Sequence, residues 1–304
     1  MSPLRVFVTG GAGFIGANLV RTLLQEGYAV TVFDDFSAGQ RAYLAGLPLS
    51  VSEGDVCDPG SVVANMAGHD HVVHLAAQTG VPKSLENPRR DCEQNVFGTL
   101  NVLEAARITG VRSLVFASSN APVGRQAPPA TETKAPLPVS PYGASKLAGE
   151  GYCLAYHGSF GLSTVVLRFG NVYGPYCAHK QSVVARFMHD LQAGKLMIDG
   201  DGSQTRDFVF VEDLTRAIVA ALRSGIGGEV FQISSGRETP ISELAGLVRQ
   251  HTGMDVVVEH GSSRPGDVRR NYSDIQKAKS LLGWQPRVDL TDGLAATWSW
   301  LQGS

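Results

Sequence analysis

The sequence predicts an α/β fold in which a doubly wound parallel sheet is followed by a smaller C-terminal α/β domain. Short apolar runs rich in β-branched residues recur along the first half of the chain, and stretches with helical periodicity lie between them. Strands that alternate with helices form a parallel sheet covered by helices on both faces. The apolar runs are residues 4–9, 28–33, 49–52, 71–75, 113–117 and 164–168.

The first elements form a βαβ unit. The strand 4–9 runs into the string GGAGFIG, residues 17–25 continue with helical spacing, and the strand 28–33 stops at Asp34 and Asp35. Further helices are expected at 95–107, 142–157, 183–192, 211–224 and 241–251, and the proline-rich stretch 128–141 is a loop.

The alternation loosens after residue 171, where polar loops become longer. We therefore expect two domains, a nucleotide domain at 1–170 and a substrate domain at 171–304, with some segments of the second returning to the first. Trp298 and Trp300 close a last helix, in which we expect them to serve as packing residues.

Three glycines stand where the first strand meets the first helix. Gly10, Gly13 and Gly16 form a G-x-x-G-x-x-G motif, with Phe14 and Ile15 expected to pack beneath it. Glycine at these points permits a tight turn and lets backbone N–H groups approach a pyrophosphate at the helix N-terminus. The motif indicates a Rossmann-type dinucleotide site.

The end of the second strand predicts which dinucleotide binds. Asp34 follows Gly16 by 18 residues, at the place where a carboxylate accepts hydrogen bonds from a ribose 2′-hydroxyl and repels a 2′-phosphate. Arg41 is close enough in sequence to leave NADP open. The carboxylate nevertheless favours NAD.

A tyrosine and a lysine stand four residues apart in the string SPYGASKLAGE. This spacing places the Tyr142 phenol and the Lys146 ammonium on one face of a helix, one turn apart. A neighbouring positive charge favours the ionised phenol, so Tyr142 is a plausible base. Such a pair is common on helix surfaces, but here it follows a nucleotide loop and the serines Ser118 and Ser119, in the order a hydride-transfer enzyme needs.

The composition argues against several classes of function. The 304 residues carry 26 Lys plus Arg and 28 Asp plus Glu, a balance that disfavours a nucleic-acid binder driven by bulk charge. The four cysteines form no C-x-x-C pair, which is typical of free thiols in a reducing compartment. No spacing predicts a metal site, and no signal peptide or membrane-spanning run is recognisable, so we expect a cytoplasmic protein.

Eight strings taken together resemble the extended short-chain dehydrogenase/reductase family. They are TGGAGFIG, GDVCD, HLAAQ, FASSN, YGASK, LRFGNVYGP, RDFVFVEDL and RPGDVRR. Within the family the chain is most similar to the NAD-dependent UDP-glucose (UDP-galactose) 4-epimerase group, with UDP-glucuronate 4-epimerases as close relatives. The cofactor positions implied are Asp34 and Asp35 at the adenosine ribose, Asp55 and Val56 at the adenine, and Ala76, Ala77 and Asn95 along the dinucleotide channel.

The same resemblance implies a catalytic triad of Ser119, Tyr142 and Lys146. As a phenolate, Tyr142 takes the proton of the sugar 4-hydroxyl while C4 gives hydride to the nicotinamide. Lys146 holds the nicotinamide ribose and lowers the pKa of Tyr142, and Ser119 bridges the substrate oxygen and the phenol. Hydride then returns to the other face of the ketone, so NAD is regenerated in each cycle.

Two features depart from the family pattern around Ser119. Val123 stands where a tyrosine is usual, which reshapes the edge of the pocket. Asn120 and Ala121 stand where sugar-nucleotide 4,6-dehydratases place Asp and Glu, and neither side chain can act as an acid or base. Chemistry beyond C4 therefore lacks its proton carriers, which implies epimerisation.

The resemblance also implies a set of substrate contacts. Arg206 and Arg264 match arginines that grip the substrate diphosphate, Asp267 takes the uridine ribose hydroxyls, and Asn171 touches the diphosphate or sugar. Asn120, beside Ser119, is expected at the substrate as well.

The sugar stays open among a hexose, a hexuronate and an N-acetylhexosamine. Asn271 stands where galactose-specific members can carry a bulky tyrosine, which leaves room beyond a plain hexose. His179, Lys180 or Arg186 could hold a uronate carboxylate. The arginine that uronate epimerases carry shortly after the Gly-Pro dipeptide is missing, which favours a neutral hexose.

Other functions are compatible with the same residues. A sugar-nucleotide dehydrogenase or reductase would consume or release nicotinamide cofactor in proportion to product. A non-catalytic NAD-bound regulator would have no need to keep Tyr142 and Lys146 together. The resemblance further implies a homodimer formed through the helices at 95–107 and 142–157.

Overall fold

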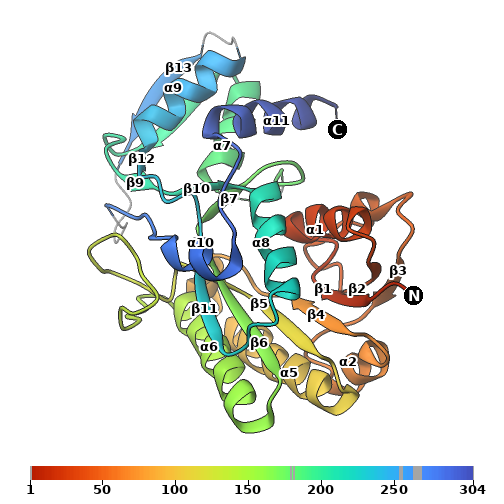
Figure 1. The fold of residues 1–304 in the computed structure, drawn as a ribbon. Coiled ribbons are helices and arrows are strands. Elements are labelled where there is room, and N and C mark those ends of the chain that lie inside the picture. Colours follow the sequence, from red (N-terminus) through yellow and green to blue (C-terminus); the bar gives the residue numbers. More distant parts are fainter. Residues whose placement is uncertain (1, 179, 181, 253–255, 263–268, 304) are drawn as a thin grey trace.

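The computed structural model describes residues 2–178, 180, 182–252, 256–262 and 269–303. Its central element is a seven-stranded sheet of strand order β11-β6-β5-β4-β1-β2-β3, in which every neighbouring pair is parallel (Figure 1). The strands are β1 (Arg5–Thr9), β2 (Ala29–Asp34), β3 (Ser50–Glu53), β4 (His71–His74), β5 (Ser113–Ser119), β6 (Ser163–Phe169) and β11 (Glu229–Ile233). The predicted doubly wound parallel sheet is confirmed.

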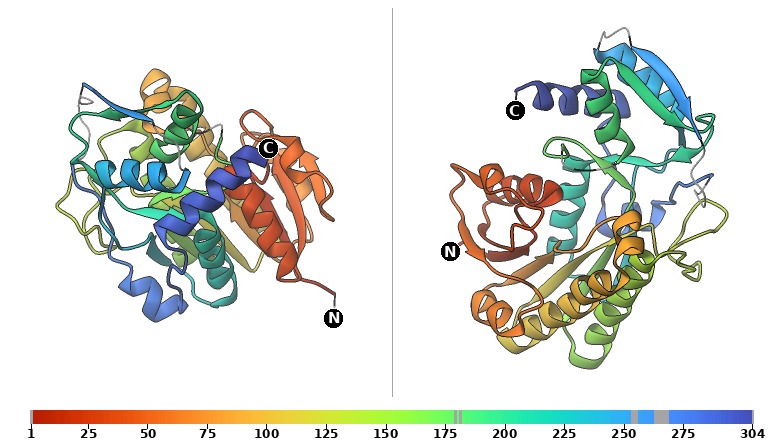
Figure 2. Two further views of the ribbon diagram at one scale, coloured as in Figure 1. Left: turned by 90° about the horizontal axis from the view of Figure 1, so that it is seen from above. Right: turned by 180° about the vertical axis from the view of Figure 1, so that it is seen from behind.

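Helices cover both faces of this sheet (Figure 2). One face packs against α1 (Phe14–Gln25) and α8 (Val211–Arg223). The other packs against α2 (Pro59–Met66), α5 (Gly98–Thr109) and α6 (Pro141–Phe160). Successive strand residues point to opposite faces, so each strand except β3 contributes to both apolar cores. Across the described ranges, no helix has the length and apolar character needed to cross a bilayer.

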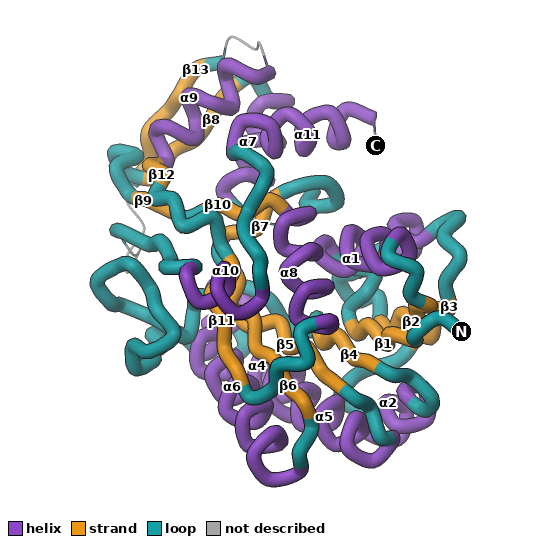
Figure 3. Tube along the Cα trace, viewed as in Figure 1, coloured by secondary structure: helices purple, strands orange, loops and turns teal. Residues whose placement is uncertain are grey.

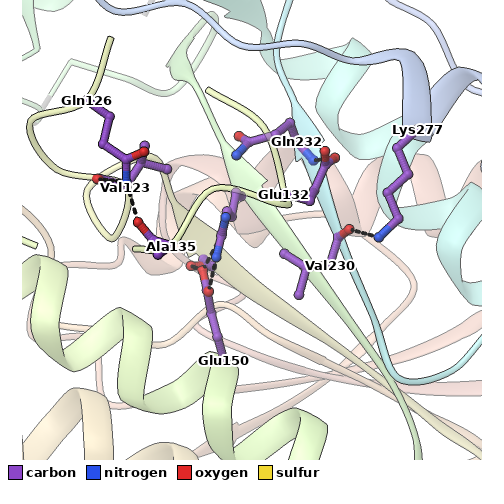
Figure 4. Close-up of polar contacts among 10 residues, drawn as sticks. Val123, Gln126, Glu132, Ala135, Glu150, Val230, Gln232 and Lys277 are labelled. Carbon is purple, nitrogen blue, oxygen red and sulfur yellow. Dashed lines mark hydrogen bonds and ion pairs between the residues drawn. The ribbon is translucent and has the colours of Figure 1, made fainter. Parts of the chain in front are cut away.

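The edge strand β11 was not predicted from the sequence. It comes from beyond residue 170. So do α8 and α10 (Gln276–Leu282), which pack against strands of the sheet. On its free edge, Gln232 donates its backbone N–H to Glu132 (2.7 Å), and the Val230 carbonyl accepts from Lys277 (2.8 Å; Figure 4). The 121–140 loop and α10 therefore cover an edge that would otherwise be open to pairing.

The other residues after 170 form a smaller unit with a core of its own (Figure 3). Its helices are α7 (Val183–Gln192), α9 (Ile241–Thr252) and α11 (Leu290–Gly303). Its strands pair two by two, β8 (Lys195–Asp199) with β13 (Val257–Gly261), β7 (Asn171–Tyr173) with β10 (Phe208–Phe210), and β9 (Thr205–Arg206) with β12 (Thr239–Pro240). Trp298 packs on this core, whereas Trp300 lies against Tyr43 and Tyr176.

A buried carboxylate joins the smaller unit to the sheet. Asp207, between β9 and β10, is fully buried and accepts from the N–H groups of Ser235 (2.8 Å), Gly236 (3.1 Å) and Ser273 (3.1 Å). Burial raises the pKa of Asp207, and the hydrogen bonds from Ser235 and Ser273 oppose that effect. Since Ser235 and Gly236 follow β11, the contacts fix the β9–β10 corner to the chain leaving the sheet.

A buried ion pair clamps α6 to the sheet. Glu150 of α6 accepts from Arg168 of β6 at 2.9 and 2.7 Å and from the Ser118 hydroxyl, at the end of β5, at 2.5 Å. The Arg168 and Glu150 side chains are only 4% and 3% exposed. These hydrogen bonds offset part of the desolvation of the pair, whose Arg168 Nη1 has no partner among the described residues, and either side chain alone would be an uncompensated buried charge.

We expect Glu150→Ala to lower the free energy of unfolding by about 3–5 kcal/mol, because it leaves the Arg168 guanidinium buried without a counter-ion. Equilibrium denaturation in guanidinium chloride measures the change. Glu93→Gln is the control, since the Arg89–Glu93 pair is exposed, and it should change stability by less than about 1 kcal/mol. A loss for Glu150→Ala as small as that of the control would show that the pair does not hold α6.

Candidate active site

A cleft opens at the carboxyl ends of the parallel strands, where doubly wound sheets bind ligands. Its lining contains every cofactor residue predicted from the sequence except Asn95. These residues are Gly10, Gly13, Phe14, Ile15, Gly16, Asp34, Asp35, Asp55, Val56, Ala76, Ala77, Tyr142 and Lys146. The topology therefore gathers loops that lie far apart in the sequence around one cavity.

The glycine loop after β1 is too tightly packed for larger residues. Gly10 has a φ of +71°, and a Cβ there would lie 2.6 Å from the Ala76 backbone nitrogen. A Cβ on Gly16 would lie 2.3 Å from the Gly10 carbonyl oxygen. No side chain caps α1 at Gly13, so its first-turn N–H groups are left for a ligand, as in a pyrophosphate site.

The Asp34 carboxylate is held by backbone donors at the end of β2. It accepts from the N–H groups of Ala12 and Phe36, both at 2.9 Å. Burial raises its pKa, and these two hydrogen bonds oppose the rise. Arg41 pairs with Glu53 and does not line the cleft. The Asp34 carboxylate at the end of β2, with no arginine from the following loop in the described cleft lining, favours NAD.

Two of the predicted cofactor residues differ in how they reach the cleft. Asp55 lines it and accepts from the Cys57 N–H at 2.8 Å. Asn95 lies behind the wall, 1% exposed, and its amide bonds the backbone N–H and carbonyl of Gln78 at 2.8 and 3.0 Å. Because Gln78 lines the cleft, Asn95 shapes the channel through the backbone of its neighbour.

Two members of the predicted triad, Tyr142 and Lys146, line the cleft, and Ser119 lies near Tyr142. Tyr142 and Lys146 lie on α6, whose N-terminus is capped by the Ser140 hydroxyl. The Lys146 ammonium is 3% exposed and donates to the Ala117 carbonyl at 2.8 Å. Ser119, the last residue of β5, is near enough to lower the pKa of the Tyr142 phenol, and its hydroxyl accepts from the Ala121 N–H at 3.2 Å. The neighbouring Ser118, and not Ser119, is among the residues that line the cleft, but the Ser118 hydroxyl is used by Glu150.

Burial shifts the pKa of both groups on α6 away from their ordinary values. It raises the pKa of Tyr142 to about 12, with Ser119 opposing and the Asp91 charge adding to the rise. It lowers the pKa of Lys146 to about 8, against the attraction of Asp91. Ser119 is the described residue that lowers the pKa of the Tyr142 phenol. The Lys146 ammonium is instead directed at the Ala117 carbonyl. The effect of Lys146 on Tyr142 stays a prediction.

A second cleft lies in the smaller unit and contains two of the predicted substrate residues, Asn171 and Arg206. Asn171 donates to the Asp207 carbonyl at 3.2 Å, and Arg206 donates to the Thr205 carbonyl at 2.7 Å. The other two residues predicted at this end, Arg264 and Asp267, lie outside the described residues.

Asn120 lies apart from both clefts, in a small hollow that also includes Asn271. Its side-chain nitrogen donates to the Ser273 hydroxyl at 3.0 Å. In the described part of the chain its side-chain oxygen has no hydrogen-bond partner.

The two described cations proposed for a uronate carboxylate, Lys180 and Arg186, lie in different cavities. Lys180 lines the cofactor cleft and donates to the Thr79 hydroxyl at 3.3 Å. Arg186 lines the second cleft and pairs with Asp199 at 2.9 Å. His179 is outside the described residues. Lys180 and Arg186, although only six residues apart, therefore extend into different cavities.

Comparison with known proteins identifies the family. Residues 6–234 match the family model described as NAD dependent epimerase/dehydratase family. The chain belongs to this family. The epimerase/dehydratase chain is 39% identical to the UDP-glucose 4-epimerase of Mycolicibacterium smegmatis, over 97% of each chain. It is also 40% identical to a dTDP-glucose 4,6-dehydratase of Streptomyces griseus, over 97% of this chain and 93% of that one.

The solved structures agree with the sequence matches. The UDP-glucose 4-epimerase of Thermotoga maritima, solved with UDP-glucose, has a TM-score of 0.94 and 36% identity and covers 99% of each chain. The resemblance inferred from the motifs is therefore confirmed, and the protein is an NAD-dependent enzyme of the epimerase/dehydratase family. Its relatives catalyse more than one reaction on more than one nucleotide sugar.

The residues of the cofactor cleft in this family member fit NAD. The crowded glycine loop, the uncapped start of α1 and the Asp34 carboxylate suit a pyrophosphate and an unphosphorylated ribose. No group of three His, Cys, Asp or Glu side chains within the described ranges is placed to hold a metal ion.

Sequence reasoning missed two buried carboxylates next to the site. Glu150 stands four residues after Lys146, and that i, i+4 spacing was a signal for a shared helix face. Asp91 lies outside all of the motifs that carry the family resemblance, so no signal in the sequence marked it.

Proposed function

We propose that this epimerase/dehydratase family member is a 4-epimerase of a UDP-sugar, acting by transient oxidation at C4. The position of the acidic groups in the cofactor cleft carries the proposal. The acidic side chains of its described lining, Asp34, Asp35 and Asp55, all belong to the β2 and β3 ends of the sheet. A 4,6-dehydratase must protonate the 6-hydroxyl as it leaves, which requires an acid near the sugar.

The residues beside Ser119 support the same reaction. Asn120 has a neutral amide that is bonded to Ser273, and Ala121 has no functional group. A neutral amide and a methyl group cannot deliver a proton to a leaving hydroxyl. The dehydration that some relatives perform therefore lacks an acid here, whereas oxidation and re-reduction at C4 need only the triad.

Each member of the triad has a role that its surroundings support. When NAD is bound, its nicotinamide supplies the hydride acceptor for C4. Tyr142 removes the proton from the 4-hydroxyl and returns it to the C4 oxygen after the hydride comes back. Ser119, which lies near the phenol, aligns that oxygen. Lys146 binds the nicotinamide ribose, and its positive charge favours the phenolate.

The second cleft supports a substrate diphosphate. Arg206 and Arg186 both line it, with Asn171 beside them, and guanidinium groups bind phosphate oxygens in a bidentate manner. We assign NAD to the 1–170 domain and the UDP-sugar to the 171–304 domain, with β11, α8 and α10 returning to the sheet layer. The favoured sugar is a neutral hexose.

A homodimer is part of the proposal, because α5 and α6 present apolar side chains to solvent. These helices lie side by side on one outer face (Figure 2). Ile108 on α5 and Phe160 on α6 are 57% and 56% exposed, and Leu154 adds to the patch. A patch of this kind is typical of a subunit interface.

Sedimentation velocity should give a dimer for the parent protein and a monomer for Leu154→Glu, because the substitution places a charge in the apolar patch. Leu281→Glu is the control, since Leu281 is 51% exposed on α10, away from α5 and α6. A parent that sediments as a monomer would rule out this interface.

Tyr142→Phe should bind NAD and substrate nearly as well as the parent, because only the hydroxyl is lost. We expect kcat to fall by about 10²–10⁴-fold or more, the usual effect of losing a general base. Tyr152→Phe, a partly exposed position on the same helix, should leave kcat unchanged. Near-parental turnover by Tyr142→Phe would refute the mechanism.

The two separated cations allow a test of the sugar. If the substrate is a uronate, Lys180→Ala should raise KM for UDP-glucuronate much more than for UDP-glucose, because the carboxylate loses a charged hydrogen bond. Arg186→Ala should affect both sugars alike, since Arg186 lines the second cleft. We expect the parent to prefer UDP-glucose. A clear preference for UDP-glucuronate would overturn the neutral hexose and leave the epimerase proposal standing.

A further inference from the structure

Asp91 is a buried carboxylate to which the proposed chemistry gives no role. It lies on α4 (Pro88–Cys92), which packs against α6, and is 1% exposed. One oxygen accepts from the Asn95 amide at 3.0 Å. In the described part of the chain the other oxygen has no hydrogen-bond partner. An orphaned carboxylate oxygen in a protein interior is costly, and native structures rarely keep one without a reason.

The surroundings of Asp91 connect it to the catalytic face of α6. The Asn95 amide nitrogen that donates to Asp91 also donates to the buried Ser145 hydroxyl at 3.1 Å. The same hydroxyl donates to the Tyr142 carbonyl at 3.1 Å. Ser145 directly precedes Lys146, so the polar contacts of Asp91 reach the single turn that carries both catalytic groups.

The charge of Asp91 acts on both of those groups. Burial lowers the pKa of Lys146 to about 8, and the Asp91 carboxylate is the strongest opposing charge. The same carboxylate raises the pKa of Tyr142. Burial raises the pKa of Asp91 itself, while Ser145 and Lys146 lower it.

Three other titratable groups face Lys146. Burial holds the pKa of His74, on β4, at about 3, and raises the pKa of the Cys153 thiol, so both are uncharged at neutral pH. Glu150 is charged, but Arg168 neutralises it at 2.7 Å. Asp91 is thus the described carboxylate near Lys146 that has no cation bonded to it.

We propose that Asp91 is a positioning residue whose carboxylate keeps the buried Lys146 ammonium charged where the nicotinamide ribose binds. This proposal rests on the proposed function. Asp91 lines neither cleft, so it acts through α6 and touches no reactant. Without its charge, Lys146 loses its proton at lower pH and Tyr142 ionises at lower pH. Both limbs of the pH profile then move in the same direction.

Asp91→Asn tests this inference, with Glu93→Gln as the matched control that removes the same charge two residues away at an exposed site. The NAD affinity of each protein, freed of bound nucleotide, is measured by calorimetry across pH. In the parent, affinity should fall as Lys146 deprotonates. In Asp91→Asn the fall should begin roughly one pH unit lower, a usual effect of a nearby charge in a buried site. The control should match the parent.

This readout needs no sugar, so it holds even if the proposed reaction is wrong. With an active substrate, the pH profile of kcat for Asp91→Asn should shift to lower pH as a whole, with Tm no lower than in the parent. An unshifted NAD profile, or a fall in Tm without a shift, would overturn the inference in favour of a structural role. If the Asp91→Asn variant does not fold, Asp91→Ser, which introduces a smaller neutral side chain, provides the same test.

Discussion

The active-site geometry depends on one buried ion pair, Glu150 with Arg168. The Glu150 carboxylate reaches the end of β5 through Ser118 and the end of β6 through Arg168, so α6 cannot slide along or away from the sheet. Glu150, Lys146 and Tyr142 follow one another at intervals of four residues and share a helix face. Fixing one position of this face fixes the other two. The three hydrogen bonds offset part of the desolvation cost that two buried charges would otherwise impose.

The smaller unit depends on a second polar joint and on the segment that follows β7. Asp207 binds the β9–β10 corner to the chain leaving β11. The segment after β7 reaches both cavities, because Lys180 lines the cofactor cleft and Arg186 lines the second. Tyr176, with a φ of +70°, anchors this segment against Tyr43, and the centroids of the two rings are 4.9 Å apart. A substrate that spans both clefts would therefore contact a segment that is held from both sides.

The sequence predicted the sheet, the glycine loop and the shared helix face of Tyr142 and Lys146 because each follows from local patterns. Strand and helix periods, a strand–glycine–helix junction and an i, i+4 pair need no knowledge of distant contacts. The β11 strand could not be predicted in the same way, since its place beside β6 is set by tertiary packing. Asp91 was missed for a related reason: its neighbours on α6 lie some fifty residues away in sequence. The different cavities of Lys180 and Arg186 could not be predicted, because sequence spacing says little about which cavity a loop residue enters.

The central claim is that Ser119, Tyr142 and Lys146 work without an acid for the sugar 6-hydroxyl. The fate of a label at C4 tests this claim most directly. UDP-glucose carrying deuterium at C4 is incubated with the protein, with labelled dTDP-glucose in parallel, and the products are analysed by NMR. The account predicts a C4-epimerised sugar that retains deuterium at C4, with no net change in NADH. A 4-keto-6-deoxy sugar with deuterium at C6 would contradict it.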